Sequence, residues 1–211
     1  MVTASTRDRI VDAALTAFGT KGYETTSLDA LAGELGVRKQ TILYHFASKE
    51  GVLDAVIDEA GTELIAVLEK AVARSSATGT GEGWSRVDAV VRSVFRLAGR
   101  RPELLGLLRE VSRLGPPSAT RFRKMLGPFI ERATAFLEEG MDEGEFRVQD
   151  ARLLLLATYS TVIGVATEVE VLRALGVEPT ARSLVRRRAE LLVFLQSALL
   201  PGGLAGDLAG R

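Results

Sequence analysis

Residues 28–46 read LDALAGELGVRKQTILYHF, and this stretch decides the fold of the N-terminal part of the chain. Its apolar residues recur at helical spacing in two short segments, which are separated by Gly36. Glycine adopts a positive φ that other residues resist, so the chain can turn tightly there. The small side chain of Ala32 lets the two helices approach closely. Two short helices joined in this way predict a helix-turn-helix.

The second short helix, predicted from about Arg38 to His45, keeps one polar side exposed. Donors and small polar groups of this kind suit base edges and phosphates in a major groove. Residues 36–49 also contain three basic residues and no acidic one, whereas the whole chain has 27 of each. The exposed polar residues are Arg38, Lys39, Gln40, Thr41 and Tyr44. An ordinary solvated face on a small helical bundle is the alternative interpretation.

Helical periodicity extends through nearly the whole of the 211-residue chain. A first helix is predicted between a Ser5 cap and Gly22, and a long fourth helix begins at Ser48. The sequence SSATGTGEG over residues 75–83 predicts a loop. Further helices are predicted over residues 84–100, 102–114, 118–141, 150–175 and 180–200. The predicted fold is therefore all-α, with about nine helices and no strands.

Composition excludes several classes of site. The chain has no cysteine and one histidine, so disulfides, thiolate metal sites and multi-histidine metal centres are excluded. The longest uncharged run begins at Leu153 and ends before Glu168, short of the roughly 20 residues that a membrane helix needs. No signal peptide is recognisable, so a cytoplasmic protein without membrane association is expected.

An enzyme is not predicted, and neither is a cofactor. The glycine-rich stretch at residues 79–83 has no preceding strand and no Walker lysine, which a phosphate-binding loop would need. The acidic residues between 138 and 143 have no histidine beside them, and a solvated helix face explains them. No Ser–His–Asp arrangement can be argued from a single histidine that belongs to the helix-turn-helix.

Residues 6–57 resemble the DNA-binding domain of TetR/AcrR-type transcriptional regulators. The resemblance rests on an alanine-rich first helix ending in Phe18, and on a series of short motifs in the same order as in the family. These motifs are Gly22-Tyr23, Thr25-Thr26, Leu31-Ala32, Gly36-Val37, Tyr44-His45-Phe46 and Ser48-Lys49-Glu50. They cover about a quarter of the chain. The remainder resembles the family only in its helical architecture.

The resemblance implies roles for individual residues. The side chains expected to reach into the major groove of a double-stranded operator are Lys39, Gln40 and Thr41. Those expected to contact phosphates are Thr25, Thr26, Tyr44, His45 and Lys49. Gln40 departs from the small residue common at its position, and it could read adenine through two hydrogen bonds.

A homodimer is expected, because two groove helices related by a twofold axis read a pseudo-palindrome. The predicted helix over residues 150–175 is apolar nearly all round, so it can be buried against its own subunit and a partner at once. The predicted helix over residues 180–200 is similar. The alternative is a core formed within one chain.

A ligand pocket is expected among the fourth to eighth helices, again from the resemblance. The candidate lining residues are Leu68, Val91, Phe95, Leu104, Leu108, Phe122, Met125, Phe129, Tyr159 and Ile163. Aromatic and methionine side chains can shape an apolar cavity, to which Tyr159 adds a polar group. The composition of this set favours a small, mostly apolar and weakly charged effector, although these residues could equally fill the core.

Three functional regions are therefore predicted. Residues 1–50 form a helix-turn-helix DNA-binding domain, residues 51–200 a helical ligand-binding and dimerisation domain, and residues 201–211 a flexible tail. The function that the resemblance implies is a ligand-responsive regulator that binds a palindromic operator, with repression as the family's commonest mode. The alternative is a helical small-molecule sensor or scaffold without specific DNA binding.

Overall fold

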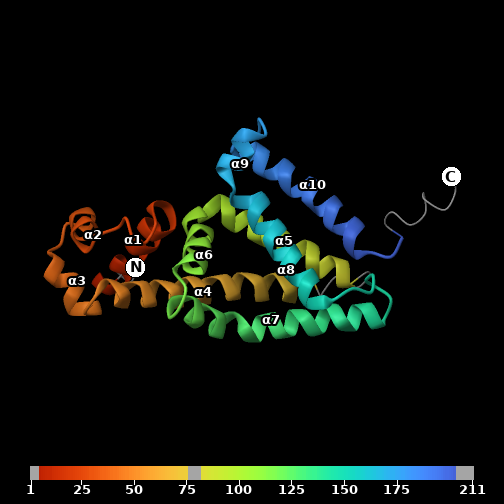
Figure 1. Ribbon diagram of the computed structural model, residues 1–211, viewed down its shortest axis with the longest axis horizontal. Coiled ribbons are helices and arrows are strands. Elements are labelled where there is room, and N and C mark those ends of the chain that lie inside the picture. The colour runs from red at the N-terminus through yellow and green to blue at the C-terminus, as the bar shows by residue number, and fades with distance from the viewer. Residues whose placement is uncertain (1–4, 76–81, 203–211) are drawn as a thin grey trace. The chain divides into compact units, whose positions relative to one another are not determined.

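The computed structural model describes residues 5–75 and 82–202, and every regular element in these ranges is an α-helix (Figure 1). The helices are α1 (Thr6–Lys21), α2 (Leu28–Leu35), α3 (Lys39–Phe46), α4 (Lys49–Ser75), α5 (Glu82–Arg100), α6 (Pro102–Leu114), α7 (Ser118–Asp142), α8 (Ala151–Thr167), α9 (Val169–Ala174) and α10 (Ala181–Leu199). The predicted all-α fold is confirmed. Most of the predicted loop at 75–83 and of the predicted tail lies outside the described residues.

The described chain has ten helices where about nine were predicted, because the single helix expected over residues 150–175 is divided. At Glu168 the backbone has φ −78° and ψ 76°, which ends α8 before α9 begins. The Arg187 guanidinium donates a hydrogen bond to the carbonyl of Val165, one of the last carbonyls of α8. Apolar residues continue on both sides of the break, so their pattern did not reveal it.

Local capping explains why several helices begin and end where the sequence predicts. The Ser5 hydroxyl accepts a hydrogen bond from the Asp8 N–H at 3.1 Å, and the Asp8 carboxylate accepts one from the Ser5 N–H at 3.2 Å. Thr180 caps α10 in the same reciprocal manner with Ser183. Gly36 has φ 67° and ψ 31°, the left-handed conformation expected for the turn between α2 and α3.

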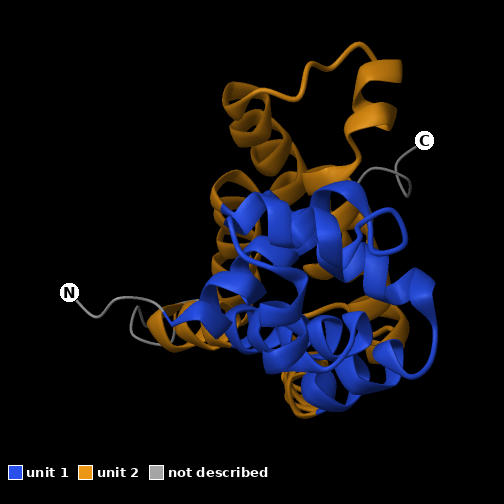
Figure 2. Ribbon diagram, turned by 90° about the vertical axis from the view of Figure 1, so that its left-hand side faces the viewer, with its two compact units in different colours: residues 1–65, 101–127 blue, residues 66–100, 128–211 orange. Residues whose placement is uncertain are grey.

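The chain forms two compact units (Figure 2). The first contains residues 1–65 and 101–127, and the second contains residues 66–100 and 128–211. Helix α6 thus belongs to the same unit as the helix-turn-helix, where it packs along α1. The predicted boundary after residue 50 is a division by function and stays a prediction, whereas the compact units follow helix packing.

A glycine-to-glycine crossing joins α1 to α6 in the first unit. A Cβ atom built on Gly106 would lie 2.0 Å from the Gly19 carbonyl oxygen, and one on Gly19 would lie 2.0 Å from the Glu103 carbonyl oxygen. Contacts this short are impossible for real side chains, so the two backbones touch directly. Leu104, Leu107 and Leu108 of α6 are buried beside this crossing.

Ion pairs add to the first unit around the crossing. Arg101, just before α6, donates to Glu103 at 2.6 Å and to Asp12 of α1 at 3.2 Å, and it lies 3.4 Å from Glu63 of α4. Arg121 at the start of α7 pairs with Asp58 of α4 through two hydrogen bonds of 2.7 and 2.5 Å. Two-point pairing of this kind fixes side-chain geometry more firmly than a single contact.

In the second unit, α10 packs against both α5 and α8, and α5 packs against α8. The buried side chains include Val91 and Phe95 of α5 and Leu191 and Leu195 of α10. The segment before α8 secures the end of α10, since the Arg147 N–H donates to the Leu199 carbonyl at 2.8 Å. Across residues 5–75 and 82–202, no helix combines the length and apolar composition that crossing a membrane requires.

The crossing gives a first prediction. Gly19→Ala should lower the free energy of unfolding by about 1–3 kcal/mol or more, because the added methyl group meets backbone that cannot rotate away. Gly33→Ala is the matched control, since Gly33 lies in α2 with nothing within 4 Å of a built Cβ. It should be neutral or stabilising by up to about 1 kcal/mol. Urea unfolding measures both, and equal effects would contradict the assigned role of the crossing.

Candidate nucleic-acid interface

The short helix α3 is held by apolar contacts on one side only. Ile42 is fully buried, and Leu31 and Ala32 of α2 are buried in the same unit. The Arg9 guanidinium of α1 donates to the Leu35 carbonyl at 3.3 Å, which satisfies the end of α2. The other side of α3 therefore carries the polar residues that are predicted to contact DNA.

Most predicted contact residues are exposed. Tyr44 is 86% exposed, the highest value among the large apolar and aromatic side chains that protrude from the described surface. Thr41 and Lys49 are half-buried. The other exposed members of the set are Thr25, Arg38, Lys39, Gln40 and His45. The structure thus presents these side chains together from α3 and its flanks, and their contacts with DNA stay predictions.

The two threonines before α2 differ in their surroundings. Thr26 is only 4% exposed, and its hydroxyl donates to the Gly22 carbonyl at 2.8 Å. Thr25 is exposed, and its hydroxyl donates to the carbonyls of Lys21 and Gly22. Both hydroxyls therefore stabilise the turn after α1. Thr25 is the better placed of the two for a phosphate, since its side chain reaches the surface.

Helix α3 begins without the side-chain cap that most helices use. Arg38 occupies the N-cap position and makes no capping hydrogen bond with its side chain. Serine, threonine, asparagine and aspartate are preferred there because their oxygen accepts from the first free N–H groups. An arginine side chain offers no acceptor to these N–H groups, and the Thr41 N–H donates instead to the Arg38 carbonyl at 2.8 Å. The arginine also adds a positive charge at the start of α3.

Lys49 has a second environment besides its predicted phosphate contact. Its ammonium nitrogen lies 4.1 Å from the centre of the Tyr23 ring, over the ring face. Tyr23 packs edge-on against Phe18 of α1, with ring centres 5.2 Å apart. Lys49 thus connects the start of α4 to the turn between α1 and α2, in addition to any contact with DNA.

Tyr23 is the centre of a network that reaches α6. Its hydroxyl donates to the Glu50 carboxylate at 3.3 Å, and its backbone N–H donates to the Glu110 carboxylate of α6 at 2.7 Å. Burial and the neighbouring Glu50 carboxylate raise the pKa of Tyr23 to about 12. The pKa of the Glu50 carboxyl is lowered by hydrogen bonds from the Glu50 backbone N–H and from the Ser48 side chain. The sequence analysis missed Glu110, because no local pattern links it to residues 87 positions earlier.

Lys39 is paired, which the sequence analysis also did not anticipate. Its ammonium group donates to the carboxylate of Asp29 in α2 at 2.8 Å. Residues 36–49 contain no acidic residue of their own, so the acid beside α3 comes from the preceding helix. A helical wheel of α3 alone cannot reveal such a partner.

The predicted ligand-lining residues are divided between the two units. Leu104, Leu108, Phe122 and Met125 belong to the first, and Leu68, Val91, Phe95, Phe129, Tyr159 and Ile163 belong to the second. All four of those on α5 and α6 are deeply buried, whereas Tyr159 is 45% exposed. Their role in ligand binding stays a prediction.

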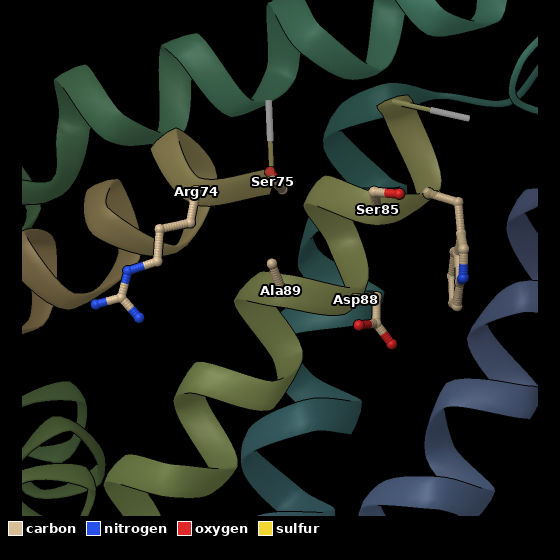
Figure 3. A pocket seen from close by; sticks show the side chains of 6 residues that line it. Arg74, Ser75, Ser85, Asp88 and Ala89 are labelled. Atoms are coloured by element: carbon tan, nitrogen blue, oxygen red, sulfur yellow. The ribbon is translucent and has the colours of Figure 1, made fainter. Parts of the chain in front are cut away.

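A cavity of about 410 Å³ lies elsewhere in the second unit, between the end of α4 and the start of α5 (Figure 3). Its lining residues are Arg74, Ser75, Trp84, Ser85, Asp88 and Ala89. None of the ten predicted residues lines it.

Two family models match the chain. The model for bacterial regulatory proteins of the tetR family matches residues 10–56, which span α1 to the first turns of α4. The model for the tetracyclin repressor-like C-terminal domain matches residues 80–167. Together they cover more than half of the chain. The protein belongs to the TetR family.

Individual relatives agree with this TetR assignment. The negative transcriptional regulator IcaR of the biofilm operon icaADBC from Staphylococcus aureus (strain Newman) is 40% identical over 48 residues. That match spans 23% of this chain and only 26% of the relative, about a quarter of its length. The transcriptional regulator UidR of Escherichia coli (strain K12) is 24% identical over 172 residues, covering 77% of this chain and 83% of UidR.

The fold is also that of solved transcriptional regulators. The ketosteroid transcriptional regulator KstR2 of Mycobacterium tuberculosis matches with a TM-score of 0.74 and 18% identity. The match covers 94% of this chain and 97% of KstR2. At this level of identity the likeness establishes the fold.

The Tyr23 network gives a second prediction, for high pH. The folded-state pKa of about 12 exceeds the ordinary value of 10, so the unfolded chain loses this proton first as the pH rises. The free energy of unfolding should therefore fall between pH 10 and 12, by about 2 kcal/mol from this group. Tyr23→Phe removes the hydroxyl and should lose that part of the pH dependence. Urea unfolding at several pH values measures the free energy of unfolding of both proteins. If this free energy falls by the same amount in wild type and in Tyr23→Phe between pH 10 and 12, the prediction is contradicted.

Proposed function

We propose that this protein is a ligand-responsive, sequence-specific DNA-binding transcriptional regulator that acts in the cytoplasm, and that it is a repressor. The observation that carries the proposal is the polar face of α3, which is exposed in a chain of the TetR family. IcaR, a relative in the DNA-binding region, is a negative regulator, which supports repression here. The operator would be a palindrome read by two copies of α3.

Within this proposal the residues of α3 divide into two roles. Lys39, Gln40 and Thr41 at the start of the helix read base edges, because the N-terminal residues of a recognition helix enter the groove. Tyr44 and His45, one turn further on, contact phosphates. Phosphate contacts fix the register of the helix on the duplex, and base contacts supply the sequence preference.

A homodimer through α8 and α10 is the proposed assembly. Leu153 and Leu156 of α8 and Val193 and Phe194 of α10 are each more than half exposed. These helices also pack against each other within the second unit. Large exposed apolar patches on soluble proteins mark interaction sites. A second copy would cover this surface and set the spacing of the two half-sites.

The effector is proposed to be a small, mostly apolar molecule. The candidate lining residues are predominantly aliphatic and aromatic, and KstR2, a protein of the same fold, is described as a ketosteroid regulator. An effector that prefers the state with misplaced groove helices weakens operator binding by its coupling free energy, typically about 1–3 kcal/mol. Helix α4 is the proposed connection, since it is continuous from the DNA-binding region into the second unit.

Selection of duplexes from a random DNA library tests the proposal, and Gln40 gives the third prediction. The wild-type protein should enrich an inverted repeat at moderate salt. Gln40→Ala should bind the same repeat but lose discrimination at one adenine in each half-site, by about 1–3 kcal/mol. Quantitative binding to single-base variants of the repeat measures this.

The control for that measurement is a residue with a phosphate role. Tyr44→Phe removes a hydroxyl that is exposed on the same helix, so it should weaken all duplexes to a similar extent without changing the preferred bases. The selection could also enrich no sequence, with DNA binding lost as the salt concentration rises. That outcome would favour the alternative of a helical sensor or scaffold. Once an operator is known, its release by candidate molecules tests the effector.

The fourth prediction concerns the dimer. Phe194→Arg places a charge in the proposed interface and should weaken the dimer by about 2 kcal/mol or more. Val148→Arg is the matched control, because Val148 is also apolar and 81% exposed but lies outside α8 and α10. Sedimentation equilibrium measures both variants. A Phe194→Arg dimer as stable as that of the control would exclude this interface.

A further inference from the structure

The pair formed by Asp29 and Lys39 lies within the helix-turn-helix itself. Asp29 is in the first turn of α2, Lys39 is the first residue of α3, and their side chains meet at 2.8 Å. The side chains are 70% and 46% exposed, respectively. Exposed ion pairs contribute only about 0–1 kcal/mol to stability. The pair therefore affects what this surface can bind more than it affects folding.

The pair leaves Lys39 with a defined direction and spare donors. A lysine ammonium group has three N–H donors, and Asp29 receives one of them at 2.8 Å. Two donors stay free for an outside acceptor. A free lysine side chain loses about 2 kcal/mol of rotamer entropy when it is immobilised. In this chain, part of that ordering is present before any duplex binds.

The carboxylate also changes which acceptors Lys39 can take. A phosphate close to the ammonium group would be close to Asp29 as well, and the two negative charges repel. The O6 and N7 atoms of guanine are neutral acceptors with the spacing that a lysine can contact in the major groove. The Asp29 carboxylate therefore disfavours phosphate contacts by Lys39 and leaves the base edge as the better partner.

We propose that Asp29 is a positioning residue that makes Lys39 a guanine-reading side chain instead of a general phosphate contact. The inference rests on the proposed function, in which α3 enters the major groove. It adds a specificity determinant on α2, outside the recognition helix. It also assigns a base: each half-site contains a guanine read by Lys39 beside the adenine assigned to Gln40.

The fifth prediction uses Asp29→Asn, which removes the charge but keeps the size of the side chain. Asp29 is exposed, so the core is unaffected. Lys39 then becomes free to neutralise a phosphate on any duplex. At 0.1 M salt, affinity for random DNA should rise up to about eight-fold per subunit, and its salt dependence should steepen by about 0.9 in log–log slope per subunit. Affinity for the selected operator should rise less, so the ratio of operator to random binding falls.

Two matched controls separate positioning from a change in net charge. Glu34→Gln removes the same charge from the same helix, where Glu34 lies 4.0 Å from Lys21. It should shift operator and random binding alike and keep their ratio. In a Lys39→Met background, Asp29→Asn should no longer change the ratio, since the side chain it positions is absent.

The outcomes are distinct. A fall in the ratio that depends on Lys39, together with lost discrimination at the guanine, supports the proposal. A ratio that is unchanged, as in Glu34→Gln, or that rises, would overturn it, because Asp29 would then act only as a charge or as a competitor for Lys39. Failure of the wild-type protein to select any duplex would refute the proposed function itself, and this is seen before any variant is made.

Discussion

An eight-residue helix does not fold in isolation, and the candidate interface consists of one. Nucleation of a helix is unfavourable, so a helix this short exists only where packing supports it. In α3 that support comes from fully buried Ile42 and from α1 and α2, which are themselves held at their ends by local caps. Because α3 is packed on one side only, its polar side stays exposed. Weakening these apolar contacts would therefore also disturb the polar side chains on the exposed side of α3.

The electrostatics of the candidate interface depend on the acidic side chains beside its lysines more than on the composition of residues 36–49. The chain has equal numbers of acidic and basic residues, and the locally basic stretch at 36–49 is moderated by acids from neighbouring elements. Asp29 faces Lys39, and Glu50 lies beside the Tyr23 hydroxyl, whose ring receives the ammonium of Lys49. Both lysines are thus held in defined positions. For Lys39 this is the basis of the proposed preference for a base edge over a phosphate.

The sequence was sufficient for features that depend on nearby residues. The Ser5 and Thr180 caps, the left-handed Gly36 and the polar face of α3 are local, and each can be derived from spacing and side-chain chemistry. Features that join distant residues were not predictable. Glu110 meets the Tyr23 N–H across 87 positions, and neither residue has a local pattern that names the other. The end of α8 at Glu168 was missed for a related reason, since the interaction at that end comes from Arg187 and the apolar pattern runs through it.

The contact between Gly19 and Gly106 has a consequence for the exchange of parts between related regulators. A chimaera that takes residues 1–50 from this chain and the remainder from another would separate α1 from the α6 backbone that it touches. Any side chain at the position of Gly106 in the recipient would collide with the α1 carbonyl at Gly19. A transferable module would instead include α6, so that Gly19 and Gly106 stay together. Without α6, the recipient protein needs an equally small residue at the position of Gly106.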